Sequence, residues 1–276
     1  MHIAIVREIA KQELIISIRN KWTIIFAVVF GVLVLSISYF GIMAEGFSGM
    51  QNFSRTSASI LNLVLYIVPL ISLTMGTLSF TGDKGSTELL FSQPISRTEI
   101  LAGKLTGIFA SIAFSTLIGY AIAGVVIISS SGFEGFLPYL SLVLLSLFLS
   151  LVFLSIAILV AILNRRKSKA FGITLFLWFF FVLFYDLLVI GVSLFFSGQV
   201  ANQFLFFSLF GNPVDMVRVA SLIILDNVTI FGAAGAALLR FLGGDVLSVL
   251  LLVLALSFWF MIPFYLSKKL VARQDI

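Results

Sequence analysis

The chain contains no cysteine and a single histidine, His2. The lack of cysteine excludes disulfides, thiolate metal sites and cysteine nucleophiles. One histidine is too few for an H-E-x-x-H zinc motif, and a serine–histidine pair fails for the same shortage. The six methionines are scattered along the chain, which is typical of packing residues, so we expect no metal site.

A phosphate-binding loop is also missing. Gly103 and Lys104 form a Gly-Lys pair, but Thr98 stands where such a loop needs its first glycine, and Leu105 follows the lysine in place of Ser or Thr. We therefore expect no cofactor in this chain and assign any ATP and Mg²⁺ to another one. An intramembrane enzyme built on serine and lysine stays as a minor alternative, although every lysine lies at or beyond the end of an apolar run.

Charged residues are scarce as well. They make up 11% of the 276 residues against 61% apolar residues, which leaves too little polar surface for a soluble globule. The formal charge of +5 does not indicate nucleic acid, because the basic residues sit at the ends of apolar runs. We predict an all-α, single-domain membrane protein over 1–276 with six spans, each long enough for a core of about 30 Å. The runs are 22–43, 59–80, 105–129, 138–163, 171–196 and 246–266.

The basic residues predict the orientation. If the N-terminus is cytoplasmic, fourteen Lys and Arg residues fall on the cytoplasmic side and only Arg55, Arg218 and Arg240 fall outside. This bias follows the positive-inside rule. We therefore expect a multi-pass protein of the cytoplasmic membrane with both termini in the cytoplasm.

Residues 1–21 precede the first span and are amphipathic. In a helix, their apolar side chains share one arc and their polar side chains lie opposite, which is typical of a helix in the membrane interface. Glu13 falls inside the apolar arc, where a bare carboxylate would be costly. We expect it to meet a donor from the cytoplasmic loops.

Residues 81–104 form a polar interval with both charge signs between the second and third spans. Gly82 and Gly85 interrupt the preceding helix, a short helix can follow, and Pro94 ends it. Ser96 and Glu99 then form an S-x-x-E capping box. A short polar helix between two rigid spans would pass a push to both, so we interpret the interval as the contact for a cytoplasmic motor; the alternative is an ordinary capped loop. The residues assigned to the contact are Gly82, Asp83, Lys84, Gly85, Ser86, Thr87, Glu88, Pro94 and Arg97.

Residues 197–245, between the last two spans, are too apolar for a solvated linker. Asn212 as N-cap, Pro213 at the first helical position and Asp215 in the first turn predict a helix that runs to about Leu225. Arg218 is three residues from Asp215 and close enough to pair with it. We predict a partly buried helical lid over the outer mouth.

Asp186 is the only ionisable residue deep in an apolar run. An intramembrane carboxylate favours a functional role. The alternative is a structural hydrogen bond to a hydroxyl or a backbone group on a neighbouring helix. Both hypotheses remain open from the residues alone.

The order of an interfacial helix, six spans, a mixed-charge interval and an outer helical loop resembles the ABC-2 type permeases. Residues 85–104, GSTELLFSQPISRTEILAGK, are similar to the coupling-helix pattern of that family. Further stretches resemble the permeases that take part in maturing the copper centres of nitrous oxide reductase. These stretches are QELIISIRNKW (12–22), WFFFVLFYDLL (178–188) and GNPVDMVRV (211–219). The chain departs from the family at Gly82 and Asp83, where glutamates are usual, and in the basic loop 164–169.

The resemblance implies an exporter permease of the type V fold with extracellular helices between spans five and six. It also implies a homodimer of twelve spans, two ATPase subunits docked on residues 82–93 and an accessory protein on the outer helices. The expected role is a transport subunit, not an enzyme, that couples ATP hydrolysis to export or to a mechanical signal during copper-enzyme maturation. An ABC-2 exporter of a drug, lipid or peptide, and a scaffold that passes motion but no cargo, remain alternatives.

Overall fold

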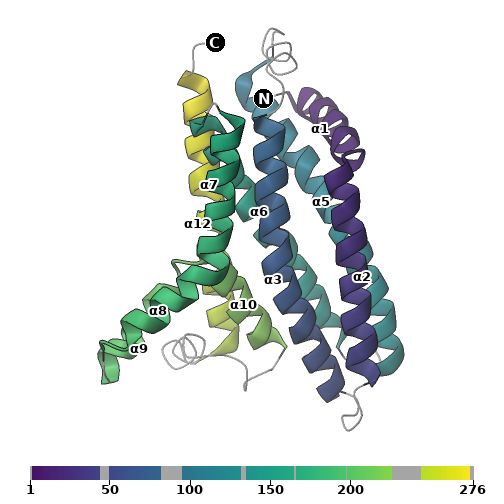
Figure 1. Cartoon of the computed structure of the whole chain (residues 1–276), viewed down its shortest axis with the longest axis vertical. Helices are drawn as coiled ribbons and strands as arrows, with labels where there is room; N and C mark the ends of the chain where they lie inside the picture. Colours follow the sequence, from purple (N-terminus) through teal and green to yellow (C-terminus); the bar gives the residue numbers. More distant parts are fainter. Residues whose placement is uncertain are drawn as a thin grey trace.

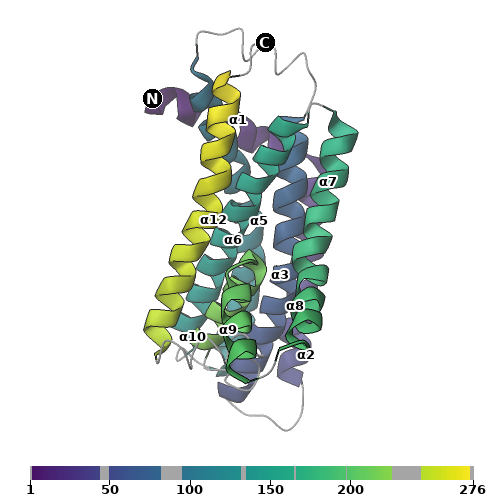
Figure 2. The ribbon, with the colours of Figure 1, turned by 90° about the vertical axis from the view of Figure 1, so that its left-hand side faces the viewer.

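The computed structural model describes residues 2–43, 50–81, 95–131, 135–164, 166–196, 198–225 and 244–273. All regular elements in these ranges are helices. Six stretches are long and apolar enough to cross a membrane, and they stand side by side as one bundle except at the end of one span, which turns away from the others (Figures 1 and 2). The prediction of an all-α protein with six spans is confirmed. Five spans are α2 (Lys21–Met43), α3 (Met50–Phe80), α5 (Arg97–Ser131), α6 (Phe136–Leu163) and α12 (Asp245–Arg273), and the other is α7 (Lys167–Phe179) continued by η1 (Phe180–Phe184) and α8 (Tyr185–Ser193).

The spanning helices are longer than the apolar runs that predict them. Helix α5 begins at Arg97, eight residues before its run, and α12 continues to Arg273, seven residues beyond its run. Backbone hydrogen bonds do not depend on side-chain polarity, so a helix continues past its apolar stretch until a cap or a break ends it. The polar helix ends extend beyond the apolar belt.

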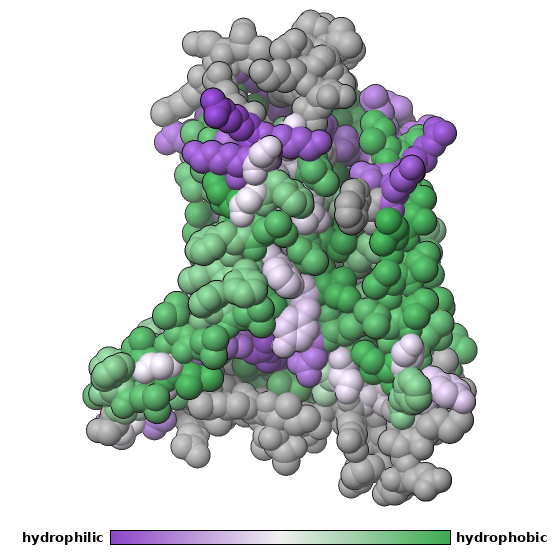
Figure 3. Space-filling model, viewed as in Figure 1, coloured by the Kyte–Doolittle hydropathy of each residue, from purple (hydrophilic) through white to green (hydrophobic). Residues whose placement is uncertain are grey.

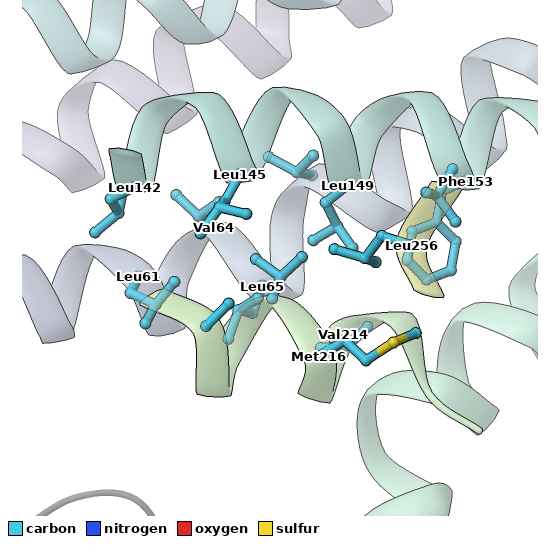
Figure 4. Packing of buried hydrophobic residues seen from close by; sticks show 14 of the residues in the cluster. Leu61, Val64, Leu65, Leu142, Leu145, Leu149, Phe153, Val214, Met216 and Leu256 are labelled. Atoms are coloured by element: carbon cyan, nitrogen blue, oxygen red, sulfur yellow. The ribbon is translucent and has the colours of Figure 1, made fainter. Parts of the chain in front are cut away.

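Helix α6 lies at the centre of the bundle. It is apolar along most of its length, 72% of its span is buried, and it packs against α3, α10 and α12. Figure 4 shows Leu149 and Phe153 of α6 near Leu65 of α3 and Leu256 of α12. Gly76 permits the close approach of α3, because an added methyl group would lie 2.7 Å from Cβ of Ala157.

Helix α1 (Ile3–Ile18) lies at one end of the bundle, at an angle to the long helices (Figure 1). Ile9, Glu13 and Ser17 are its buried residues, and their spacing of four places them on one face, which packs against α5. Hydrophilic side chains gather at this end, with a broad apolar belt next to them (Figure 3). This arrangement fits an interfacial helix.

The chain after α7 leaves the bundle and then returns. Five residues of π-helix, η1, separate α7 from α8, and α8 has no buried residue. Helices α8 and α9 (Gly198–Leu209) form an arm that projects from the bundle (Figure 1). Helix α10 (Pro213–Ile224) is bent by 103° from α9 and packs against α3, α6 and α12. The helix predicted as a partly buried lid is therefore largely inside the bundle, whereas the arm that precedes it projects outward.

Candidate functional site

Most of the predicted motor contact lies outside the described residues. Residues 82–94 are not described, and they include Gly82, Asp83, Lys84, Gly85, Ser86, Thr87, Glu88 and Pro94. Arg97, the ninth residue, is the first residue of α5. The described chain on each side of this interval, Thr81 and Ile95 onward, shows how the interval is attached to the bundle.

The predicted capping box is present at the start of α5. The backbone N–H of Glu99 donates to Oγ of Ser96 at 3.3 Å, and the backbone N–H of Ser96 donates to Oε2 of Glu99 at 3.2 Å. Two backbone donors that the helix would leave without partners are thereby satisfied. The polar interval therefore ends in an ordered turn.

This turn also joins two helices that are distant in sequence. The other carboxylate oxygen of Glu99, Oε1, accepts a hydrogen bond from the backbone N–H of His2 at 2.5 Å. Nη1 of Arg97 donates to the carbonyl oxygen of Val271 at 3.0 Å. The start of α5 thus holds the start of α1 and the end of α12, which lie together at one end of the bundle.

Glu13 meets a partner from the predicted cytoplasmic interval 81–104, as expected, and a second one from the end of the preceding span; among the described residues both partners lie on helices. Oγ of Ser79, near the end of α3, donates to Oε1 of Glu13 at 2.5 Å. Nζ of Lys104, in α5, lies 3.9 Å from Oε2 of Glu13 and donates to the carbonyl oxygen of Ser79 at 2.9 Å. The buried face of α1 rests on the sides of α3 and α5, so helix side chains are the groups within its reach.

A second polar cluster lies where the α8–α9 arm leaves the bundle. Asn212 caps α10 as predicted, because its Oδ1 accepts from the backbone N–H of Val214 at 3.0 Å. Its Nδ2 donates to the carbonyl oxygen of Phe181 at 2.9 Å and to Oδ2 of Asp215 at 2.8 Å. Phe181 lies in the π-helical turn, so the side chain of Asn212 joins α10 to the point where the fifth span is irregular.

Arg218 is at the centre of this cluster. Its Nη1 lies 2.7 Å from Oδ1 of Asp215, which is the predicted pair, and 2.9 Å from Oδ2 of Asp186. Asp186 does bond a neighbouring helix, but its partner is the guanidinium of Arg218 and not the hydroxyl or backbone group expected under the structural alternative. Figure 3 shows a hydrophilic patch within the apolar surface beside the arm. One guanidinium thus bonds two carboxylates and joins α8 to α10.

Two further bonds hold the turn between α9 and α10. The hydroxyl of Tyr185 donates to the carbonyl oxygen of Ser208 at 2.5 Å, and Nε1 of Trp259 donates to that of Phe210 at 3.0 Å. Sequence reasoning missed Tyr185 and Trp259. The available signal was an amphipathic aromatic residue within an apolar run, which usually places its polar atom on a partner when buried.

The described residues contain no group of three or more His, Cys, Asp or Glu side chains that could hold a metal ion. Pro213, the remaining residue of the predicted lid, is buried at the first position of α10, where the lack of a backbone N–H costs no hydrogen bond. Both clusters join helices through charge and hydrogen bonds.

Comparison with known proteins covers nearly the whole chain. The family model described as "ABC-2 family transporter protein" matches residues 7–275. The "Probable ABC transporter permease protein NosY" of Pseudomonas aeruginosa is 31% identical over 285 residues, covering 99% of each chain. The protein of the same name from Stutzerimonas stutzeri is 31% identical over 274 residues, covering 96% of this chain and 97% of its own.

Proposed function

The chain belongs to the ABC-2 transporter family and is therefore a permease component of an ABC transporter, and from this premise we propose that a separate cytoplasmic ATPase drives it. The observation that carries the proposal is the junction at the start of α5. The polar interval 82–94 enters a capped turn that is bonded to α1 through Glu99 and to α12 through Arg97. A displacement of this interval would reach three helices at once.

The ATPase contact is assigned to residues 82–93, with ATP and Mg²⁺ bound by the partner chain. Two copies of this chain would form a twelve-span core with two ATPase subunits, and both termini would face the cytoplasm. The outer cluster of Asn212, Asp215, Arg218 and Asp186 would then hold the α9–α10 turn as a gate on the far side, where an accessory protein would rest on the outer helices.

We assign the transporter to maturation of a copper enzyme such as nitrous oxide reductase. The similarity to two proteins named NosY supports this assignment. The complex would export a cargo or pass a mechanical signal to an outer protein. Export of a drug, lipid or peptide is the second candidate, since the family name does not specify a cargo.

Co-purification tests the proposal. The tagged chain, expressed with the ATPase of its own gene cluster, is expected to retain that ATPase and to change its hydrolysis rate. Glu88→Lys reverses a charge within the proposed contact and should abolish that change, whereas Arg7→Gln, on the exposed face of α1, should not. A chain that binds no ATPase, or a Glu88→Lys variant with unaltered coupling, would overturn the assignment. Flux assays in sealed vesicles separate export from signalling.

A further inference from the structure

Helix α1 contacts α5 through backbone as well as side chains. A methyl group at Gly103 would lie 2.7 Å from Cβ of Ile9, and one at Gly107 would lie 2.5 Å from the carbonyl oxygen of Ala10. Two glycines four residues apart in α5 thus allow α1 to approach closely. Such a contact has little freedom to slide, because packed backbones leave no flexible side chain to absorb a shift.

The cluster beside this contact joins α1 to α3 as well. The Glu13 carboxylate accepts from Ser79 and lies next to Lys104, which in turn donates to the carbonyl oxygen of Ser79. Glu13 and Lys104 are mostly buried, with 9% and 15% of their side chains exposed, and Nζ of Lys104 lies 5.1 Å from the centre of the Phe80 ring. Each of the three helices contributes one member.

The positions of these residues in the chain give the cluster its significance. Ser79 lies three residues before the interval 82–94, and Lys104 lies ten residues after it. One buried carboxylate on α1 therefore holds both helices that carry the proposed ATPase contact. A force on the interval acts on α3 and α5 together as long as the cluster is intact.

We infer that Glu13, Ser79 and Lys104 are positioning residues that make α1, α3 and α5 move as one body when the ATPase acts. The N-terminal helix is then a working part of the transmission and not only a membrane anchor. The inference rests on the proposed function, since it names how that coupling interval passes force into the membrane part.

The variants that test this inference are Glu13→Ala and Lys104→Met, singly and together, in the full complex in lipid nanodiscs. The matched control is Glu8→Gln, which removes a carboxylate from the same helix at an exposed position where it lies 3.7 Å from Arg7. Each single variant should lose at least about fivefold in permease-dependent ATPase stimulation. The double variant should lose no more than either single one, because both act through the same contact.

A distance measurement separates transmission from simple stability. The chain has no native cysteine, so spin labels attach only at Ile16→Cys on α1 and Asn62→Cys on α3 when the purified chain is labelled before the ATPase is added. In complexes diluted with unlabelled copies, the parent should keep the same distance with and without ATP. Glu13→Ala should show a distance that changes with ATP.

The outcomes distinguish the two proposals. If the parent chain binds no ATPase, the proposed function fails. If the parent couples normally and the Glu13 and Lys104 variants keep both its ATPase stimulation and its constant label distance, only this inference fails. Rescue of either variant by a stabilising lipid or lower temperature, with full coupling restored, would also overturn it and leave the cluster as a structural contact.

Discussion

At the scale of single residues, the two carboxylates of the outer cluster depend on one arginine. Arg218 bonds both Asp186 and Asp215, and 13% of the Asp215 side chain is exposed against 37% of Asp186. Removing one partner of a buried ion pair leaves an uncompensated charge, which costs about 3–5 kcal/mol, whereas a partly exposed group costs much less. Loss of Arg218 or Asp215 should therefore lower the free energy of unfolding by more than loss of Asp186.

Arg218→Met should destabilise the chain by roughly 3 kcal/mol, and Asp186→Asn by less than about 1 kcal/mol. Thermal unfolding in detergent measures both. If Arg218→Met unfolds at the temperature of the parent, the cluster does not hold α10. Asp186→Asn also decides the role of that residue, because full activity at normal expression would leave it a structural contact only.

Gly107 offers a second test at this scale. Gly107→Leu places a bulky group where Ala10 and Glu13 already lie, and overpacking of this kind costs about 1–3 kcal/mol. We expect α1 to detach, with faster proteolysis of the N-terminal residues. The matched control is Gly172→Leu, since nothing lies within 4 Å of a methyl group at Gly172. Equal protection of α1 in both variants would contradict the close contact.

At the scale of elements, the start of α5 depends on its capping box. Ser96→Ala removes the hydroxyl that accepts from Glu99 and should cost about 1 kcal/mol. Hydrogen exchange of the first turn of α5 should become faster in this variant. Ser141→Ala is the comparison, because that exposed hydroxyl bonds only the carbonyl oxygen four residues earlier in its own helix. Unchanged exchange after Ser96→Ala would count against the cap.

The fifth span shows how an element differs from its sequence pattern. Residues 171–196 read as one uninterrupted apolar helix, yet the structure has a π-helical turn at Phe180–Phe184 and an arm beyond it. A π-helical turn disturbs the regular hydrogen-bond ladder, and Asn212 donates to one carbonyl oxygen within it. That partner lies 31 residues away, so no local pattern indicates the break.

At the scale of the whole molecule, the orientation in the membrane stays a prediction. Cysteine variants can test it without background labelling. We expect Lys84→Cys and Arg166→Cys to react with an impermeant thiol reagent only after the cells are opened, because basic residues stay on the cytoplasmic side. Val246 lies at the start of α12, the end that we expect to face outward, and is 83% exposed, so Val246→Cys should react in intact cells. The reverse pattern would place the ATPase contact outside and end the proposed function.

The sequence alone determined the all-α membrane class, the six spans, the caps at the starts of α5 and α10, and the Asp215–Arg218 pair. These features depend on apolar length or on residues within three positions of one another, so helix geometry dictates them. Tertiary structure alone decided that Asp186 meets Arg218, that Glu13 meets Ser79 and Lys104, and that α10 lies inside the bundle. Uniformly apolar helices such as α6 do not indicate which face meets which neighbour. Polar partners between helices are therefore chosen by the packing of the whole bundle, where each buried charge must find its donor.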